Sequence, residues 1–113
     1  MTAASARLLD LAQVAQNPDA LTWTTFREGV RAHWIGEPGG CAAFLRYEPG
    51  ASVPLHEHVG QEHILVLSGY QEDDRGRYGA GSLVINAPGS RHAVRCPEGA
   101  LVLVFWERPV RFL

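Results

Sequence analysis

Residues 50–62 read Gly-Ala-Ser-Val-Pro-Leu-His-Glu-His-Val-Gly-Gln-Glu and form a compact polar segment in an otherwise apolar chain. A strand rises about 3.3 Å per residue and alternates its side chains between two faces, so His56 and His58 lie on one face, roughly 6.6 Å apart. Two imidazoles at that separation can lean onto one ion, with each nitrogen about 2.1 Å from it. A bend at residues 59–61 would bring Glu62 beside them. The segment therefore indicates a metal site.

A fourth candidate ligand, His92, follows further along the chain in the segment 88–92, which reads Pro-Gly-Ser-Arg-His. The alternative is that these histidines are ordinary surface or half-buried residues without a ligand. Glu62 favours the metal, because it precedes the apolar run 64–67 and should be buried. Buried carboxylates are rare unless they are paired or bind a metal. We therefore predict that His56, His58, Glu62 and His92 bind one ion.

A mixed set of imidazole nitrogens and a carboxylate suits Zn, Fe(II), Mn, Ni or Cu, and sequence does not choose among them. Four protein ligands leave one or two positions open to water or to a small-molecule ligand. His63 points to the face opposite Glu62, so we expect it, like His33, not to be a ligand. Four further side chains could reach a cavity, but strand parity does not decide which of them do so: Arg46, Tyr47, Tyr70 and Trp106.

The spacing resembles a known superfamily. Gly50-x5-His56-x-His58-x3-Glu62-x6-Gly69 matches the first cupin motif position for position, and Gly81-x10-His92 matches the span of the second. One departure is visible, since the second motif usually has a residue between proline and glycine, whereas Pro88 directly precedes Gly89 here. The resemblance covers roughly residues 20–113. It implies a double-stranded β-helix, the cupin jelly-roll barrel, with the metal ligands named above.

One branch is especially similar, the ChrR-like cupins. The similar segments are residues 62–70, Asp73 and Asp74, Gly81, and residues 88–92. This branch forms the sensor domain of certain anti-sigma factors, and its relatives include enzymes like acetylacetone dioxygenase.

The resemblance implies two alternative functions. One is a non-haem, Fe(II)-dependent dioxygenase acting on a small dicarbonyl or enolisable substrate. The other is a metal-binding sensor or regulatory module without catalytic activity. Anti-sigma activity is not inferred, because residues 1–20 are too short to replace a separate sigma-binding domain. Catalytic residues stay unassigned, since no nucleophile–base pair is visible.

Short β-rich runs separated by glycine and proline predict an all-β sandwich or barrel, from which the resemblance selects the jelly roll. We expect Gly69 to end the strand 64–67. The expected strands are residues 21–26, 30–35, 41–48, 64–67, 83–85 and 101–106, with a possible edge strand at 110–113.

The chain of 113 residues is long enough for one core, and we expect an N-terminal extension, 1–20, before a single cupin domain, 21–113. The extension should contain a short helical turn that stops at residues 17–19 and is partly mobile or lies across a neighbouring surface. No signal peptide or membrane span is expected. A net charge of −2 without a basic run argues against nucleic-acid or membrane partners. Cys41 and Cys96 indicate reduced thiols in a cytoplasmic protein.

The runs 64–67 and 101–106 are apolar on both faces. One face can line the barrel, and the other also needs a cover. We therefore expect a homodimer, in which a second copy covers the outer faces of the sheets. The alternative is that the N-terminal segment alone covers them.

Overall fold

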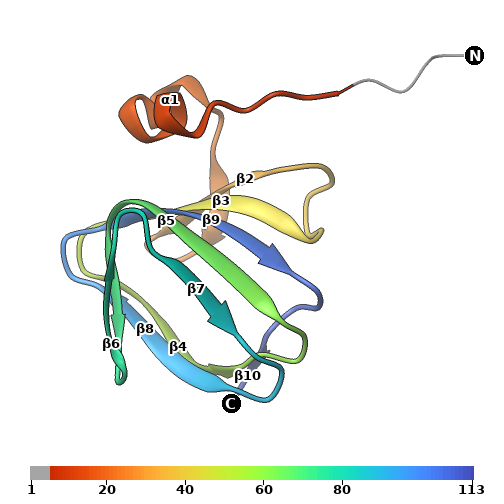
Figure 1. Cartoon of the computed structure of the whole chain (residues 1–113), viewed down its shortest axis with the longest axis vertical. Coiled ribbons are helices and arrows are strands. Elements are labelled where there is room, and N and C mark those ends of the chain that lie inside the picture. The colour runs from red at the N-terminus through yellow and green to blue at the C-terminus, as the bar shows by residue number, and fades with distance from the viewer. Residues whose placement is uncertain (1–5) are drawn as a thin grey trace, which may run out of the picture.

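In a computed structural model that describes residues 6–113, one antiparallel sheet curls into an open barrel with a short helix outside it (Figure 1). The strand order is β1-β2-β3-β9-β5-β8-β4-β10, and β6 and β7 both pair with β5. The elements are α1 (Leu11–Gln16), a 3-10 turn (Pro18–Ala20), β1 (Thr24–Arg27), β2 (Val30–Trp34), β3 (Ala42–Tyr47), β4 (Ala51–Glu57), β5 (Glu62–Asp73), β6 (Gly76–Gly79), β7 (Leu83–Asn86), β8 (Arg91–Cys96), β9 (Ala100–Trp106) and β10 (Arg111–Phe112). The expected all-β jelly roll is confirmed.

Strand β5 runs through both halves of the barrel. Its first half pairs with β7 and β9, and its last residues pair with β6 and β8. Gly69 makes the bend between the halves, with a φ of 69° next to a register shift between Val66 and Ser68. The expectation that Gly69 ends the strand is wrong, because a bulge beside it redirects the strand without stopping it, and β5 continues to Asp73. As a result, Asp73 reaches the half of the barrel that contains β8.

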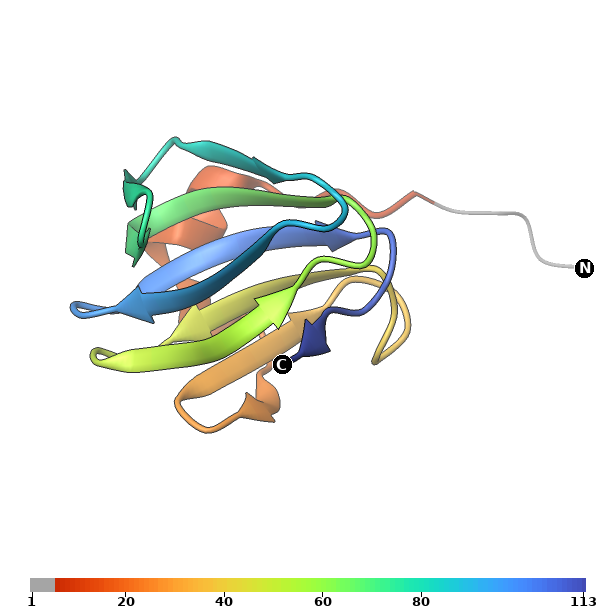
Figure 2. The ribbon, with the colours of Figure 1, turned by 90° about the horizontal axis from the view of Figure 1, so that it is seen from below.

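Strand β8 was not expected from the sequence. Its side chains alternate between exposed Arg91 and Arg95 and buried His92, Val94 and Cys96, which is the period of a strand with one solvated face. Figure 2 shows β4 and β8 side by side, and their ladder pairs His56 with His92. The backbone thus places two of the predicted ligands opposite each other.

The helix α1 packs on the outer face of the sheet of its own chain. Asp10 caps it by accepting hydrogen bonds from the amides of Ala12 and Gln13. Val14 is buried in a cluster with Phe44, Leu101 and Leu103. The expected helical turn is therefore present, and the N-terminal segment covers part of the face for which we expected a second copy. Further along that face, Leu83 and Ile85 are each 57% exposed.

Two smaller findings concern expectations from the sequence. Across residues 6–113, no helix has the length and apolar character needed to cross a membrane. Both cysteines are free thiols, Cys41 exposed and Cys96 buried, and burial raises the pKa of Cys96 to about 12. The boundary between extension and domain at residue 20 stays a prediction.

Candidate metal centre

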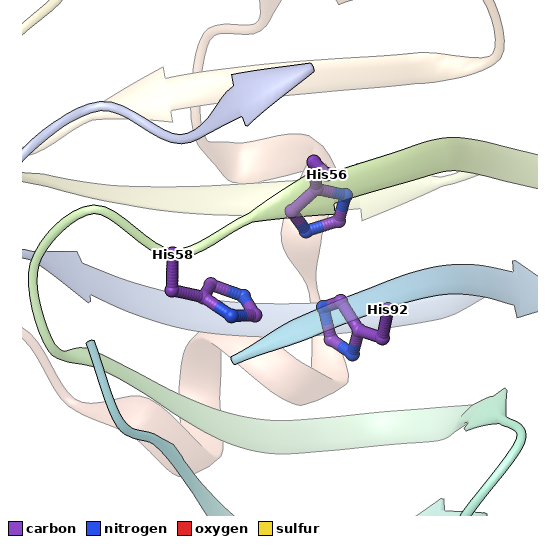
Figure 3. A group of neighbouring side chains, drawn as sticks. All are labelled: His56, His58 and His92. Carbon is purple, nitrogen blue, oxygen red and sulfur yellow. The ribbon is translucent and has the colours of Figure 1, made fainter. Parts of the chain in front are cut away.

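Three histidines from three places in the fold meet inside the barrel (Figure 3). His56 lies near the end of β4, His58 follows that strand directly, and His92 is the second residue of β8. Their ring centroids are 4.6 to 5.1 Å apart, and one nitrogen of each lies within 4.8 Å of the others. All three are buried, with at most 4% of their surface exposed. Three of the four predicted ligands therefore lie close together.

The Nδ1 atom of each ring is held by an oxygen. His56 Nδ1 is 2.8 Å from the carbonyl of Pro54, and His92 Nδ1 is 3.0 Å from Oδ2 of Asp73. His58 Nδ1 is 3.1 Å from the carbonyl of Ser90. Carbonyl and carboxylate oxygens only accept hydrogen bonds, so each Nδ1 carries a proton, and in the neutral imidazole each Nε2 then has a free lone pair.

The Nε2 atoms of His58 and His92 are buried without a hydrogen-bond partner. Orphaned polar atoms are rare in protein interiors and call for an explanation such as an ion. Histidines that bind metals characteristically donate their other ring N–H to a carbonyl or a carboxylate, as these do. The donor set therefore fits a divalent transition metal.

Glu62, the first residue of β5, lies beside the histidines. Its Oε1 is 3.1 Å from His58 Nε2, yet the two atoms are not aligned for a hydrogen bond. The same oxygen accepts a hydrogen bond of 3.0 Å from the buried amide of Asn86. Burial raises the pKa of Glu62, but His58 and Asn86 outweigh it and leave the pKa below its usual range. Glu62 is therefore an ionised carboxylate beside His58.

Burial also determines the protonation of two histidines. It lowers the pKa of His56 and of His92, although the Pro54 carbonyl and the Asp73 carboxylate each act in the opposite direction. A lowered pKa favours the neutral imidazole, which is the form that binds a metal.

A cavity of about 530 Å³ adjoins the cluster and reaches the edge strands β1 and β10. His56, Glu62 and His92 line it, whereas His58 lies behind them and does not. Aliphatic side chains form much of the cavity wall, and three aromatic side chains that contact one another line the part near the edge strand β1. These lining residues are Leu45, Val53, Ile64, Val94 and Val104, with Phe26, Trp34 and Trp106.

The structure decides which of the four uncertain side chains face this cavity. Tyr47 and Trp106 line it. Arg46 instead pairs with Asp19 at 2.7 Å, and Tyr70 stacks below the guanidinium of Arg77 at 4.2 Å. Burial raises the pKa of Tyr47, so its hydroxyl keeps its proton.

The two histidines that we excluded lie away from the cluster. His63 is on the outer face of the sheet, in register with Ile85 and Phe105. His33 contacts the carbonyl of Thr22 and the guanidinium of Arg7.

Three supporting residues were not assigned a role from the sequence. Asp73, Asn86 and Ser90 hold His92, Glu62 and His58, respectively. Asp73 and Ser90 both lie in the segments that resemble ChrR-like cupins, which is the only signal the sequence offered. Their contacts depend on the register of strands that are far apart in the chain.

The curled antiparallel barrel and the histidines inside it define a cupin. Residues 11–111 match the family model of the ChrR cupin-like domain, and the chain belongs to that family. It is 32% identical over 102 residues to the anti-sigma-E factor ChrR of Cereibacter sphaeroides, across 88% of this chain and 48% of that protein. The chain thus spans about half the length of that relative.

Solved structures agree on the fold. The complex of Rhodobacter sphaeroides SigE with the anti-sigma factor ChrR matches with a TM-score of 0.71 and 30% identity, over 83% of this chain and 54% of the other. A putative acetylacetone dioxygenase from Methylibium petroleiphilum matches with a TM-score of 0.74 over 100% of this chain and 85% of the other. Its identity is 16%, so this likeness concerns the fold alone.

Proposed function

We propose that the protein binds one divalent transition metal through His56, His58, Glu62 and His92, and holds a small molecule next to it. The observation that carries this proposal is the orientation of the three imidazoles. Each Nδ1 is held by an oxygen, and the Nε2 atoms of His58 and His92 are buried without a partner. Zn, Fe(II), Mn, Ni and Cu all suit this donor set.

The position of the cavity supports a role beyond a structural ion. Structural zinc sites are closed, whereas catalytic sites keep a position open. Three of the four proposed ligands line the cavity, so an open position would face it. Its largely aliphatic and aromatic wall favours a small, largely apolar molecule.

The reaction that suits this site best is dioxygenation of a small dicarbonyl or enolisable compound. A bound Fe(II) would supply the oxygen chemistry that zinc, which has no accessible redox change, does not. The residues of the chain orient the substrate in the apolar cavity. Buried Tyr47, whose hydroxyl stays protonated, is a hydrogen-bond donor on its wall.

The second candidate is a metal-binding sensor or regulatory module. It is favoured by the 32% identity to an anti-sigma factor. In this case the cavity would hold an effector in place of a substrate.

Oxygen consumption separates the two candidates. Protein loaded anaerobically with Fe(II) is mixed with acetylacetone and related enolisable compounds in an oxygen electrode, with zinc-loaded protein as the control. Uptake by the Fe(II) form alone supports the dioxygenase, and Glu62→Gln should then reduce it without unfolding the barrel. No uptake, together with bound zinc that Fe(II) does not displace, supports the sensor.

We also propose a homodimer in the cytoplasm that has no nucleic-acid or membrane partner. The exposed apolar side chains of Leu83 and Ile85 on β7 and of Phe105 on β9, the two strands that flank β5, support the dimer. The free thiols support a cytoplasmic location. The net charge of −2 argues against a nucleic-acid partner.

A further inference from the structure

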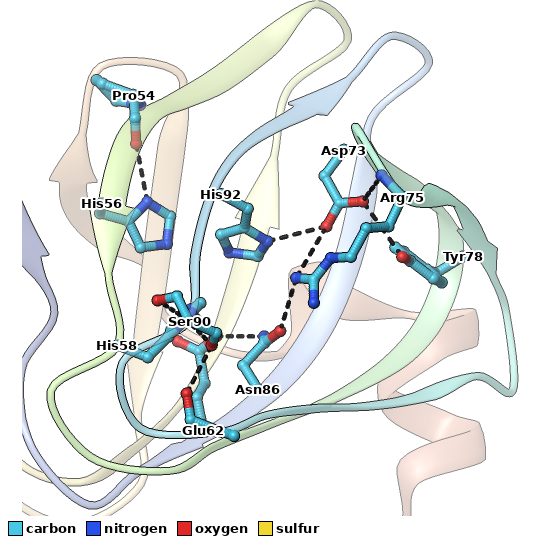
Figure 4. A network of polar contacts seen from close by, with 11 residues as sticks. Pro54, His56, His58, Glu62, Asp73, Arg75, Tyr78, Asn86, Ser90 and His92 are labelled. Atoms are coloured by element: carbon cyan, nitrogen blue, oxygen red, sulfur yellow. Dashed lines mark hydrogen bonds and ion pairs between the residues drawn. The ribbon is translucent and has the colours of Figure 1, made fainter.

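We infer that Arg75, at the tip of the β5–β6 hairpin, joins the supports of two metal ligands and so helps to set the affinity of the site. The support of His92 is Asp73, and the support of Glu62 is Asn86 (Figure 4). This inference rests on the proposed metal site. It adds three positioning residues that do not themselves face the ion.

Asp73 orients His92 from the side away from the cluster. Its Oδ2 accepts the Nδ1–H of His92 at 3.0 Å, and both side chains are 3% exposed. The other oxygen, Oδ1, accepts from the Arg75 amide at 2.9 Å and from the Tyr78 hydroxyl at 3.2 Å. Donors on both oxygens fix the carboxylate plane, and thereby the ring of His92. A carboxylate behind a histidine also makes its free nitrogen a stronger donor to a metal.

Asn86 orients Glu62 in a similar way. The two residues face each other in the β5–β7 ladder, and Asn86 has no exposed surface. Its Nδ2 donates to Glu62 Oε1 at 3.0 Å, while its Oδ1 accepts from Arg75 Nη2 at 3.4 Å. A carboxylate accepts and a guanidinium donates, so these two neighbours allow one orientation of the amide.

Arg75 connects the two supports. The same Nη2 that contacts Asn86 is 3.7 Å from Oδ2 of Asp73. The continuous chain of contacts therefore runs from His92 through Asp73, Arg75 and Asn86 to Glu62. The Arg75 side chain is 51% exposed, so this connection reaches the surface at a hairpin turn.

The β5–β6 hairpin offers a matched control for substitutions of Asp73 and of Arg75. Asp74 directly follows Asp73 but is exposed. Arg77 lies two residues beyond Arg75 and pairs with Glu72 at 3.2 Å, away from the ligands, with a side chain that is 63% exposed. Asp73→Asn and Arg75→Ala can therefore be compared with Asp74→Asn and Arg77→Ala, which change the same charges.

The test is the zinc Kd of metal-free protein, measured by competition with a chromogenic chelator, together with the visible absorption spectrum of the Co(II) form. Asp73→Asn should raise the Kd by about 10- to 100-fold, the usual effect of losing a partner of a metal-binding histidine. Arg75→Ala should raise it less, and both should alter the Co(II) bands, which report ligand geometry. Asp74→Asn and Arg77→Ala should change neither measurement.

The outcomes separate this inference from the metal site itself. Wild-type protein that binds zinc, with variants at Asp73 and Arg75 that match their controls in Kd and Co(II) spectrum, would overturn the inference and leave the proposed site intact. Wild-type protein that binds no zinc would overturn both. If Asp73→Asn does not fold, the surface variant Arg75→Ala decides alone.

Discussion

The geometry of the candidate metal centre depends on the hydrogen bond that each histidine ring makes through Nδ1. The three histidines differ in their supports, a proline carbonyl for His56, a serine for His58 and a carboxylate for His92. Each support occupies Nδ1 and leaves Nε2 toward the interior. The site is therefore preorganised, because a metal would meet rings that already have the required tautomer and direction.

Replacing one histidine tests the assignment of ligands. His92→Ala should lower zinc affinity by about 100-fold or more. The loss of only a supporting residue typically costs about 10- to 100-fold. His63→Ala should have no effect, since His63 lies on the outer face. Isothermal titration of metal-free protein with zinc measures both, and equal losses in the two variants would show that the ligands are wrongly assigned.

Acid should destabilise the fold through the buried histidines. The folded-state pKa values of His56 and His92 are lowered by burial, whereas an unfolded histidine titrates near about 6.5. Their contribution to stability is thus present above about pH 6.5 and is lost as pH falls through the lowered folded values. Bound metal lowers those values further, so the loss should be larger with zinc.

Thermal unfolding at pH 8 and pH 5, with and without excess zinc, measures this coupling. The thermal midpoint should be lower at pH 5 than at pH 8, and excess zinc should raise it by less at pH 5 than at pH 8. A midpoint with excess zinc that is the same at both would contradict the coupling.

Among the elements, β5 shows where sequence reasoning succeeds and where it stops. The spacing of His56, His58 and Glu62 predicted that the three side chains lie together, because all three belong to one strand–turn–strand segment. The continuation of β5 to Asp73 was missed, since a glycine in the sequence is equally typical of a strand end and of a bend within a strand. The network through Asp73 and Asn86 was missed because it depends on the register of β5 with β7 and β8, strands that are distant in the sequence.

Two glycines distinguish the cost of an unfavourable backbone conformation from the cost of a steric clash. Gly69 and Gly81 both have positive φ, 69° and 90°. A Cβ on Gly69 would lie 2.2 Å from the carbonyl oxygen of Gly99, whereas one on Gly81 would meet nothing within 4 Å. Gly81→Ala should cost about 1–2 kcal/mol of unfolding free energy. Gly69→Ala should cost at least about 1 kcal/mol more, because backbone must move to relieve the clash.

Urea unfolding of the two alanine variants measures these costs. Equal losses of stability would show that the close approach of Gly69 to Gly99 does not constrain the bend in β5.

At the scale of the whole molecule, the outer face of the sheet is covered only in part. The helix α1 packs over Phe44, Leu101 and Leu103, so the N-terminal segment supplies some of the cover that the apolar strands require. Leu83, Ile85 and Phe105 stay exposed beyond it, by 57%, 57% and 48%. This remaining patch is where we expect a second copy to pack.

Light scattering measures the oligomeric state. We predict a mass of twice the 12.4 kDa of one chain. Ile85→Glu should give the monomer, because it would bury a charge in the interface. Leu55→Glu, at a site that is 48% exposed on another strand, should leave the mass unchanged. A wild-type mass of one chain at every concentration would contradict the dimer.

The most direct test of the metal centre is elemental analysis of protein purified from cells grown without added metal, followed by titration with Zn, Fe(II) or Ni. The orientation of the three imidazoles and the position of Glu62 predict about one divalent transition metal per chain, either present on purification or taken up to that ratio. Protein that contains no such metal, and takes up none of the three ions, would contradict the central claim.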